Sequence, residues 1–180
     1  INSMIPYISE TAFDAAMENN EDFIGFGIVK EDGTAYYSDG TTADLGDRDY
    51  IQEAFTGKTA FSDILISRVT GEPVLMVATP IDSVTGEKAL LLARIDGFVL
   101  SEVVEEVKIG EQGYAFIINK EGYFQGHPNR DNVVNQVNYL IDSPDSNEGK
   151  AVKKLTSNDQ GIFEFSTSNG EHNYLAYYTL

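Results

Sequence analysis

Two charged residues, Arg48 and Asp96, have the chemistry to hold a small charged ligand. A guanidinium offers five hydrogen-bond donors in a planar fork and can hold a carboxylate through two parallel hydrogen bonds. Arg48 precedes a segment with helical spacing, and Asp96 follows an apolar segment, residues 88–95, with the composition of a strand. Together they could bind the carboxylate and the ammonium of a zwitterion. Equally, Arg48 could form a surface ion pair with Asp47 or Asp49, and Asp96 could lie in a solvated Asp-Gly turn.

Aromatic and polar residues near these two extend the candidate site. Tyr50 lies two residues after Arg48 and could stack on a ligand or hydrogen-bond to it, although it could equally be a core-facing aromatic on a short helix. Strand alternation should turn some further side chains toward the same site, while most of them should prove to be packing residues. These secondary candidates are Tyr36, Tyr37, Ser62, Ser67, Met76, Ala78 and Thr79.

The elements that must position these residues follow from hydrophobic spacing and turn signals. Residues 3–20 have the apolar spacing of a lead-in helix, and residues 23–29 and 34–38 flank a Lys-Glu-Asp-Gly turn and predict a β-hairpin. Residues 49–55 place their apolar side chains on one helical face and end before Gly57. Three strands, at 59–67, 73–81 and 88–95, should follow as an antiparallel meander.

The same pattern occurs twice in the chain. Ile28-Val-Lys-Glu-Asp-Gly33 recurs as Ile117-Ile-Asn-Lys-Glu-Gly122, and each copy continues into a second strand. We therefore expect an α+β fold: a long N-terminal helix (1–22) leading into two tandem modules (23–105 and 106–180), each an antiparallel sheet with flanking helices. Residues 101–107 should form a helical linker and residues 129–150 a longer loop. The last strand of the second module should be missing, or another segment should fill its place. The chain reads as an excised piece of a longer protein.

Composition excludes several classes of function. The 180 residues hold 12 Lys and Arg against 29 Asp and Glu, a formal net charge of −17, which makes nucleic acid and anionic lipid headgroups poor partners. The absence of cysteine excludes disulfides, thiolate zinc sites and a cysteine nucleophile. No apolar stretch reaches the roughly 20 residues that a membrane-spanning helix needs. The first 105 residues hold 6 basic and 19 acidic side chains, so this half should attract cationic or zwitterionic ligands and disfavour a dianion.

Catalytic and metal-binding motifs are missing from the sequence. It contains no GxSxG, GxxxxGK or HExxH motif, so a carboxylate-based hydrolase is only a minor alternative, and we expect no cofactor. Acidic clusters at 18–22 and 44–49 lack the spacing of a calcium loop and predict a solvated face. A lone His127 before a proline predicts a structural hydrogen-bonding role, and Arg68 predicts a charge at a hairpin tip.

The order and spacing of several short motifs resemble the double Cache (dCache) family of sensor domains over nearly the whole chain. The first module carries Asp47-Arg-Asp-Tyr-Ile-Gln-Glu-Ala-Phe-Thr-Gly57, Phe61-Ser-Asp63, Thr70-Gly-Glu-Pro-Val74 and Ala78-Thr-Pro-Ile81. The second carries Ile109-Gly-Glu-Gln-Gly-Tyr-Ala-Phe-Ile-Ile-Asn-Lys-Glu-Gly122, His127-Pro128 and Tyr174-Leu-Ala-Tyr177. The resemblance implies two PAS-like modules in the extracytoplasmic part of a membrane receptor, most similar to a chemotaxis receptor, with a sensor kinase or diguanylate cyclase as further possibilities.

The resemblance also implies a ligand site in the membrane-distal first module. Arg48 matches the arginine that holds a ligand carboxylate in the family, and Asp96 matches the aspartate that holds the α-amino group in amino-acid-binding relatives. Two positions depart from those relatives, because Leu65 stands where they often carry tyrosine and Ile51 replaces a second aromatic. The implied ligand is therefore an amino acid, another small carboxylate or an amine. A ligand-free module that dimerises through the N-terminal helix is the alternative.

Overall fold

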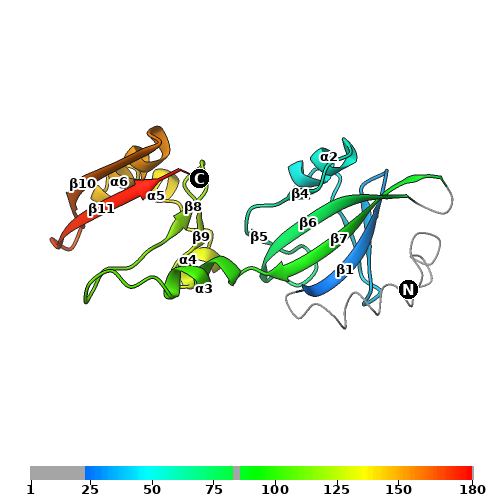
Figure 1. Ribbon diagram of the computed structural model, residues 1–180, viewed down its shortest axis with the longest axis horizontal. Coiled ribbons are helices and arrows are strands. Elements are labelled where there is room, and N and C mark those ends of the chain that lie inside the picture. Colours follow the sequence, from blue (N-terminus) through cyan, green and yellow to red (C-terminus); the bar gives the residue numbers. More distant parts are fainter. Residues whose placement is uncertain (1–22, 83–85, 180) are drawn as a thin grey trace. The chain divides into compact units, whose positions relative to one another are not determined.

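An antiparallel sheet forms the first part of the molecule (Figure 1). The computed structural model describes residues 23–82 and 86–179, and the chain divides into two units between Val99 and Leu100. In the first unit the strand order is β3-β2-β1-β7-β6-β4, and β5 also pairs with β6. The strands are β1 (Phe23–Lys30), β2 (Thr34–Tyr37), β3 (Thr42–Asp44), β4 (Ala60–Phe61), β5 (Leu65–Ile66), β6 (Pro73–Asp82) and β7 (Lys88–Asp96).

The predicted hairpin of β1 and β2 is confirmed. The backbone N–H of Gly33 donates to the carbonyl of Lys30 (2.8 Å), and the Asp32 carboxylate accepts from the N–H of Thr34 (2.9 Å). Gly33 has a φ of +85°, and a Cβ there would lie 2.5 Å from the Cα of Gly46. Glycine is therefore required at this turn both by its backbone angle and by the close passage of the loop that leads to the next helix.

One face of the sheet carries the main core. Strand alternation turns Leu90 and Leu92 of β7 to this face, together with Met76 of β6. The helix α2 (Asp49–Phe55), with the bounds that its apolar spacing predicts, packs on the same face through Ile51 and two further buried side chains. Because α2 has only seven residues, this packing rather than intrinsic propensity must hold it.

The predicted strand 59–67 is interrupted, which corrects that expectation. Its ends pair with β6 as β4 and β5, and residues 62–64 between them belong to neither strand, although the N–H of Ser62 still donates to the carbonyl of Met76 (2.9 Å). The hydroxyl of Ser62 replaces one ladder contact, since its Oγ accepts a hydrogen bond from the N–H of Met76 (2.9 Å) and donates to the carbonyl of Asp63 (2.6 Å). Strands β6 and β7 form the antiparallel pair that the sequence predicts.

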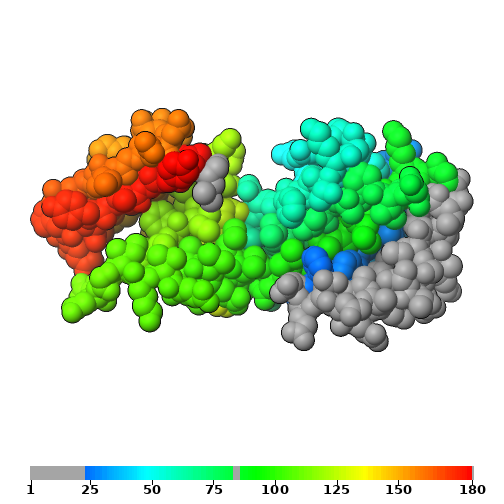
Figure 2. Space-filling view, viewed as in Figure 1, coloured from blue at the N-terminus to red at the C-terminus, as the bar shows by residue number. Residues whose placement is uncertain are grey.

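The second unit contains two separate antiparallel pairs, β8 with β9 and β10 with β11. Figure 2 shows β11, in red, on the surface of this unit. The strands are β8 (Ile117–Ile118), β9 (Phe124–Gly126), β10 (Gln160–Ser166) and β11 (His172–Tyr178), and the helices are α4 (Asp131–Val134), α5 (Tyr139–Asp142) and α6 (Asn147–Ser157). The helix α3 (Val99–Glu105) stands at the predicted linker, two residues earlier than expected.

The segment 129–150 is largely helical, although its polar composition predicts a loop. Its asparagine and serine side chains act as helix N-caps. The Oδ1 of Asn138 accepts from the N–H of Leu140 (2.9 Å) at the start of α5, and the Oγ of Ser146 accepts from the N–H of Gly149 (2.9 Å) at the start of α6. Such residues are common both in turns and at helix starts, so their abundance did not separate the two structures.

Some expectations fall on residues that the structure does not describe. The lead-in helix at 3–20 and the acidic cluster at 18–22 lie outside the described residues. Over 23–82 and 86–179, no helix is long and apolar enough to cross a membrane. The same residues bring together no group of three or more acidic or imidazole side chains that could hold a metal ion.

Candidate functional site

Arg48 stands at the start of α2, where its backbone is well held. Its N–H donates to the carbonyl of Leu45 (3.0 Å), and its own carbonyl accepts from the N–H groups of Ile51 (3.0 Å) and Gln52 (3.1 Å). The side chain is half-buried, and its Nε is fully buried without a hydrogen-bond partner among the described residues. A buried donor without a partner is costly, so the Arg48 guanidinium has unused capacity for an acceptor.

Arg68 holds the loop that precedes Arg48. Its guanidinium donates to both carboxylate oxygens of Asp47 (2.7 and 2.6 Å) and to the carbonyl of Asp44 (2.6 Å). The hydrogen bonds from Arg68 lower the pKa of the Asp47 carboxyl from 3.8 to about 2. Asp47 is thus engaged by Arg68, which leaves Arg48 without the surface partner that its sequence neighbour could have supplied. Arg68 is more than a charge at a hairpin tip, because it ties that hairpin to the start of α2.

Replacing Arg68 by alanine is expected to raise the pKa of the Asp47 carboxyl from about 2 toward 3.8. The ion pair favours the charged carboxylate, so its stabilising effect is present above pH 3.8 and is lost as the pH falls toward 2. NMR titration of the carboxyl carbons measures the midpoint. An unchanged midpoint in the variant would show that the pair does not form in solution.

Arg94 is the functional candidate that the sequence analysis missed. It lies on β7 in the same inward phase as Leu90 and Leu92, and only 5% of the residue is exposed. Its guanidinium carbon lies 4.5 Å from the centre of the Tyr37 ring, and its Nε and Nη2 are buried without hydrogen-bond partners. A charged residue at an inward position of an otherwise apolar strand was the available signal.

Tyr37 and Tyr50 lie on the face of the sheet that α2 covers, and both rings are buried in its core cluster. Burial raises the pKa of both phenols, and at Tyr37 a hydrogen bond from Arg94 opposes that rise. Arg94 stacks on Tyr37, while Tyr50 follows Arg48 by two residues at the start of α2. The four side chains form one group, which we call the arginine site: Arg48, Arg94, Tyr37 and Tyr50.

Two of the secondary candidates are buried in the same unit, and one of them lies beside Arg94. Met76 is the cross-strand partner of Arg94 and is 2% exposed. Ser67 is buried, but its Oγ accepts from the N–H groups of Val69 and Thr70 (both 3.2 Å) and so supports the turn that carries Arg68. Met76 therefore packs beside Arg94 in the core, whereas the Ser67 hydroxyl already holds backbone groups of its turn.

The remaining candidates do not join the arginine site. Tyr36 packs with Ile28 on the opposite face of the sheet, where the Lys30 ammonium lies 4.6 Å from its ring centre. The side chain of Thr79 also lies in the opposite strand phase, and its hydroxyl is 2.8 Å from that of Thr59. Ser62 bonds to backbone, and Leu65 and Ala78 pack in or against the core.

Asp96 ends β7 on the same face as Arg94, two residues further along. Its side chain is exposed, and its Oδ1 accepts a hydrogen bond from the N–H of Phe98 (2.8 Å). This is the geometry of the Asp-Gly turn that the sequence left open as an alternative. The turn approaches β6 closely, since a Cβ on Gly97 would lie 2.4 Å from the carbonyl carbon of Pro73. Within the described residues, Phe98 is the one hydrogen-bond partner of the Asp96 carboxylate.

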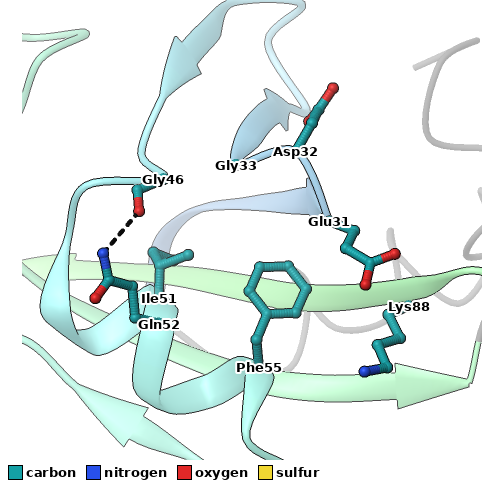
Figure 3. A pocket seen from close by; sticks show the side chains of 8 residues that line it. All are labelled: Glu31, Asp32, Gly33, Gly46, Ile51, Gln52, Phe55 and Lys88. Atoms are coloured by element: carbon teal, nitrogen blue, oxygen red, sulfur yellow. Dashed lines mark hydrogen bonds between the residues drawn. The ribbon is translucent and has the colours of Figure 1, made fainter.

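A groove of about 310 Å³ lies on another side of α2 (Figure 3). Ile51 and Phe55 supply its apolar surface, and Gln52 donates to the carbonyl of Gly46 (3.1 Å) along one edge. The remaining lining residues are Glu31, Asp32, Gly33 and Lys88. None of the four residues of the arginine site lines this groove. It presents no buried unpartnered polar group, so we do not place the candidate site there.

His127 in the second unit has the structural role that the sequence predicts. Its Nδ1 accepts a hydrogen bond from the N–H of Asn129 (2.9 Å), and its own N–H donates to the hydroxyl of Ser101 (3.3 Å). The ring packs edge-on against Phe124, with 5.0 Å between ring centres, and against Tyr114 at 5.3 Å. The imidazole thus holds a turn and fills an aromatic cluster.

Acidification is expected to destabilise the second unit through His127. Burial lowers the pKa of this imidazole below 6.5, so the unfolded chain binds the proton more readily than the folded one. Stability should therefore fall as the pH drops through 6.5 to the lower folded pKa, and should be steady with respect to this group below that value. Urea unfolding of the second unit at pH 7.5 and 5, in the wild type and in His127→Gln, measures the effect. An equal loss in both proteins would contradict it.

The antiparallel sheet with its covering helix defines an α+β fold, and comparison with known proteins identifies its family. The Cache domain model dCache_1 matches residues 1–180, so the chain belongs to the double Cache family. This confirms the family that the motifs indicated. No curated protein sequence matches the chain.

Solved structures share the fold at low sequence identity. The extracellular domain of the histidine kinase mmHK1S-Z3 has a TM-score of 0.67 and 16% identity, with 93% of this chain and 72% of that chain covered. The ligand-binding domain of the Pseudomonas aeruginosa amino acid chemoreceptor PctB, in complex with L-Arg, has a TM-score of 0.62 and 20% identity, with 93% and 70% covered. The ligand-binding domain of the Pseudomonas fluorescens chemoreceptor CtaA, in complex with L-serine, has a TM-score of 0.58 and 14% identity, with 96% of this chain and 68% of that chain covered.

Proposed function

We propose that this chain is the extracytoplasmic sensor domain of a transmembrane signalling receptor and that its first unit binds a small ligand at the arginine site. The observation that carries the proposal is Arg48, whose buried Nε has no partner at the start of α2. A guanidinium in that condition is suited to a ligand carboxylate. The proposed ligand class is an amino acid, another small carboxylate or an amine, as in the amino acid complexes of PctB and CtaA.

The proposed domain organisation follows the family. Residues 1–22 form a lead-in helix, residues 23–105 the membrane-distal ligand-binding module and residues 106–180 the membrane-proximal module. Binding closes the distal site and shifts the lead-in helix, which also pairs two copies of the receptor. Such a signal requires that the ligand bind one arrangement more tightly than the other. A chemotaxis receptor is the favoured whole protein. A sensor histidine kinase, which the likeness to mmHK1S-Z3 supports, and a diguanylate cyclase are the alternatives.

Two other functions have less support. A ligand-free dimerisation module would fill its pocket with its own side chains, yet the buried Nε of Arg48 and two nitrogens of Arg94 are left without partners. A carboxylate-based hydrolase would need convergent acidic groups. The arginine site instead combines two guanidinium groups with two phenols, and the nearby Asp47 is engaged by Arg68.

Isothermal titration calorimetry with a panel of amino acids, organic acids and amines tests the proposed function. We expect at least one carboxylate ligand to bind, and Arg48→Ala to weaken that binding. Circular dichroism of the same samples shows that the protein is folded. A folded protein that binds no member of the panel would contradict the proposal and favour the ligand-free module.

A further inference from the structure

We propose that the ligand carries two acidic groups, one held by Arg48 and the other by Arg94. This inference rests on the proposed function, because it concerns the ligand of the same site. It goes beyond that function in assigning a second anion-binding residue and in predicting a diacid. It also reverses the expectation from net charge that a dianion is disfavoured.

The first argument is the condition of Arg94. The residue is 5% exposed, and two of its three guanidinium nitrogens are buried without an acceptor. A guanidinium carries only hydrogen-bond donors, so its buried nitrogens can be satisfied only by acceptors placed against them. Leaving such a group buried and unpaired is strongly unfavourable, whereas a carboxylate at this place would satisfy both donors.

The second argument is charge balance within the described residues. The Asp47 carboxylate is engaged by Arg68. Asp39 feels the charge of Arg94, but its carboxylate accepts hydrogen bonds from the N–H and the hydroxyl of Thr41 (2.8 and 2.5 Å) and forms no described ion pair with Arg94. The site therefore holds two positive charges on Arg48 and Arg94 without a matching pair of carboxylates from the described chain.

The third argument is the geometry of the two phenols. The guanidinium of Arg94 stacks on the Tyr37 ring, which fixes the plane of its donors. Arg48 begins α2, which packs on the face of the sheet to which Arg94 turns, and Tyr37 and Tyr50 belong to the core cluster on that same face. We therefore expect a short molecule with an acidic group at each end to reach both guanidinium groups. A ligand with one carboxylate would leave one arginine unpaired.

Two chemical sources supply two carboxylates. A plain dicarboxylate would need only the two arginines. An acidic amino acid would add an ammonium, for which Asp96 offers an acceptor on the same face, two residues after Arg94. The test therefore compares both sources. The Asp96→Asn variant distinguishes them, because only the amino acid has an ammonium that the Asp96 carboxylate could bind.

Calorimetry on the whole chain with matched pairs of probes tests the inference. Succinate is compared with butyrate, and L-aspartate with L-alanine, since each pair differs by one carboxylate. We expect the diacid of at least one pair to bind at least tenfold more tightly than its partner. Arg94→Met, which keeps length but removes charge, should abolish that preference for the diacid. Asp96→Asn should weaken the binding of L-aspartate and leave the binding of succinate unchanged.

The outcomes separate the two proposals. Binding of butyrate or L-alanine as tight as that of the matched diacid would overturn the diacid inference while leaving the sensor function in place. No binding by any of the four probes, with the protein folded, would overturn the diacid inference; if the wider panel also failed, the proposed function would fall with it.

The melting temperature without ligand shows whether the Arg94→Met variant is folded. Removing an uncompensated buried charge should raise the melting temperature of the ligand-free first unit, by several degrees in Arg94→Met. A lower melting temperature would mean that the protein itself pairs Arg94, and would contradict the inference. In the wild type, succinate or L-aspartate should raise the melting temperature more than its monoacid partner does.

Discussion

Arg48→Ala is expected to weaken the binding of the carboxylate ligand by about 100-fold. Hydrogen bonds to charged groups contribute about 1.5–3 kcal/mol, and about 2.8 kcal/mol corresponds to a factor of 100 in affinity. Truncation also leaves the ligand carboxylate without a partner in a partly buried site. The backbone of Arg48 already starts α2 through its N–H and carbonyl bonds, so alanine at this position should leave the helix in place.

Two further variants make this measurement specific. Arg48→Lys keeps the charge but loses the planar fork, and we expect it to bind with intermediate affinity. Arg130→Ala is the matched control: Arg130 pairs with Glu105 in the second unit (3.1 Å), so its loss should not change ligand affinity. Calorimetry with the tightest ligand of the panel compares the three. An affinity loss in Arg130→Ala as large as in Arg48→Ala would contradict the assignment of the site.

Leu92→Ala is expected to lower the free energy of unfolding of the first unit by about 2–5 kcal/mol. Leu92 is fully buried, at 0% exposure, in the core between the sheet and α2. The loss combines the transfer of the removed methyl groups with the cavity that remains. Because Leu92 shares the face and strand of Arg94, we also expect weaker ligand binding in this variant.

Ile24→Ala provides the control for this loss. Ile24 lies on β1 in the same unit but is 52% exposed, so its truncation should change the free energy of unfolding by about 0.5 kcal/mol or less. Urea unfolding followed by circular dichroism measures both variants. Equal losses in the two would show that the α2 face is not the principal core of the unit.

The parts of the fold with strong periodicity could be predicted from the sequence. The turn at Gly33, the helix α2 and the long strands β6 and β7 each combine a clear apolar period with a turn or stop signal. The break within 59–67 could not be predicted, because it depends on the Ser62 hydroxyl reaching a β6 backbone group far along the chain. The helices within 129–150 could not be predicted, because the residue types that cap helices are also the types that are common in loops.

The candidate site was predicted only in part. Arg48 and Tyr50 could be proposed from residue type and motif order. Of the adjacent tyrosines, Tyr37 rather than Tyr36 faces the site, and period-two alternation alone cannot decide which face α2 will cover. Arg94 was overlooked within an apolar strand. The expectation from net charge that a dianion is disfavoured stays a prediction, which the diacid proposal opposes, because net charge sums exposed carboxylates as well as the few groups that face a buried site.

A crystal structure of the chain grown with succinate and with L-aspartate tests the central claim most directly. We predict that at least one of them lies between the guanidinium groups of Arg48 and Arg94, with a carboxylate at hydrogen-bonding distance from each and the Tyr37 ring beside it. The account would be contradicted by a structure in which both guanidinium groups are paired with the protein's own carboxylates and the ligand is bound elsewhere or not at all.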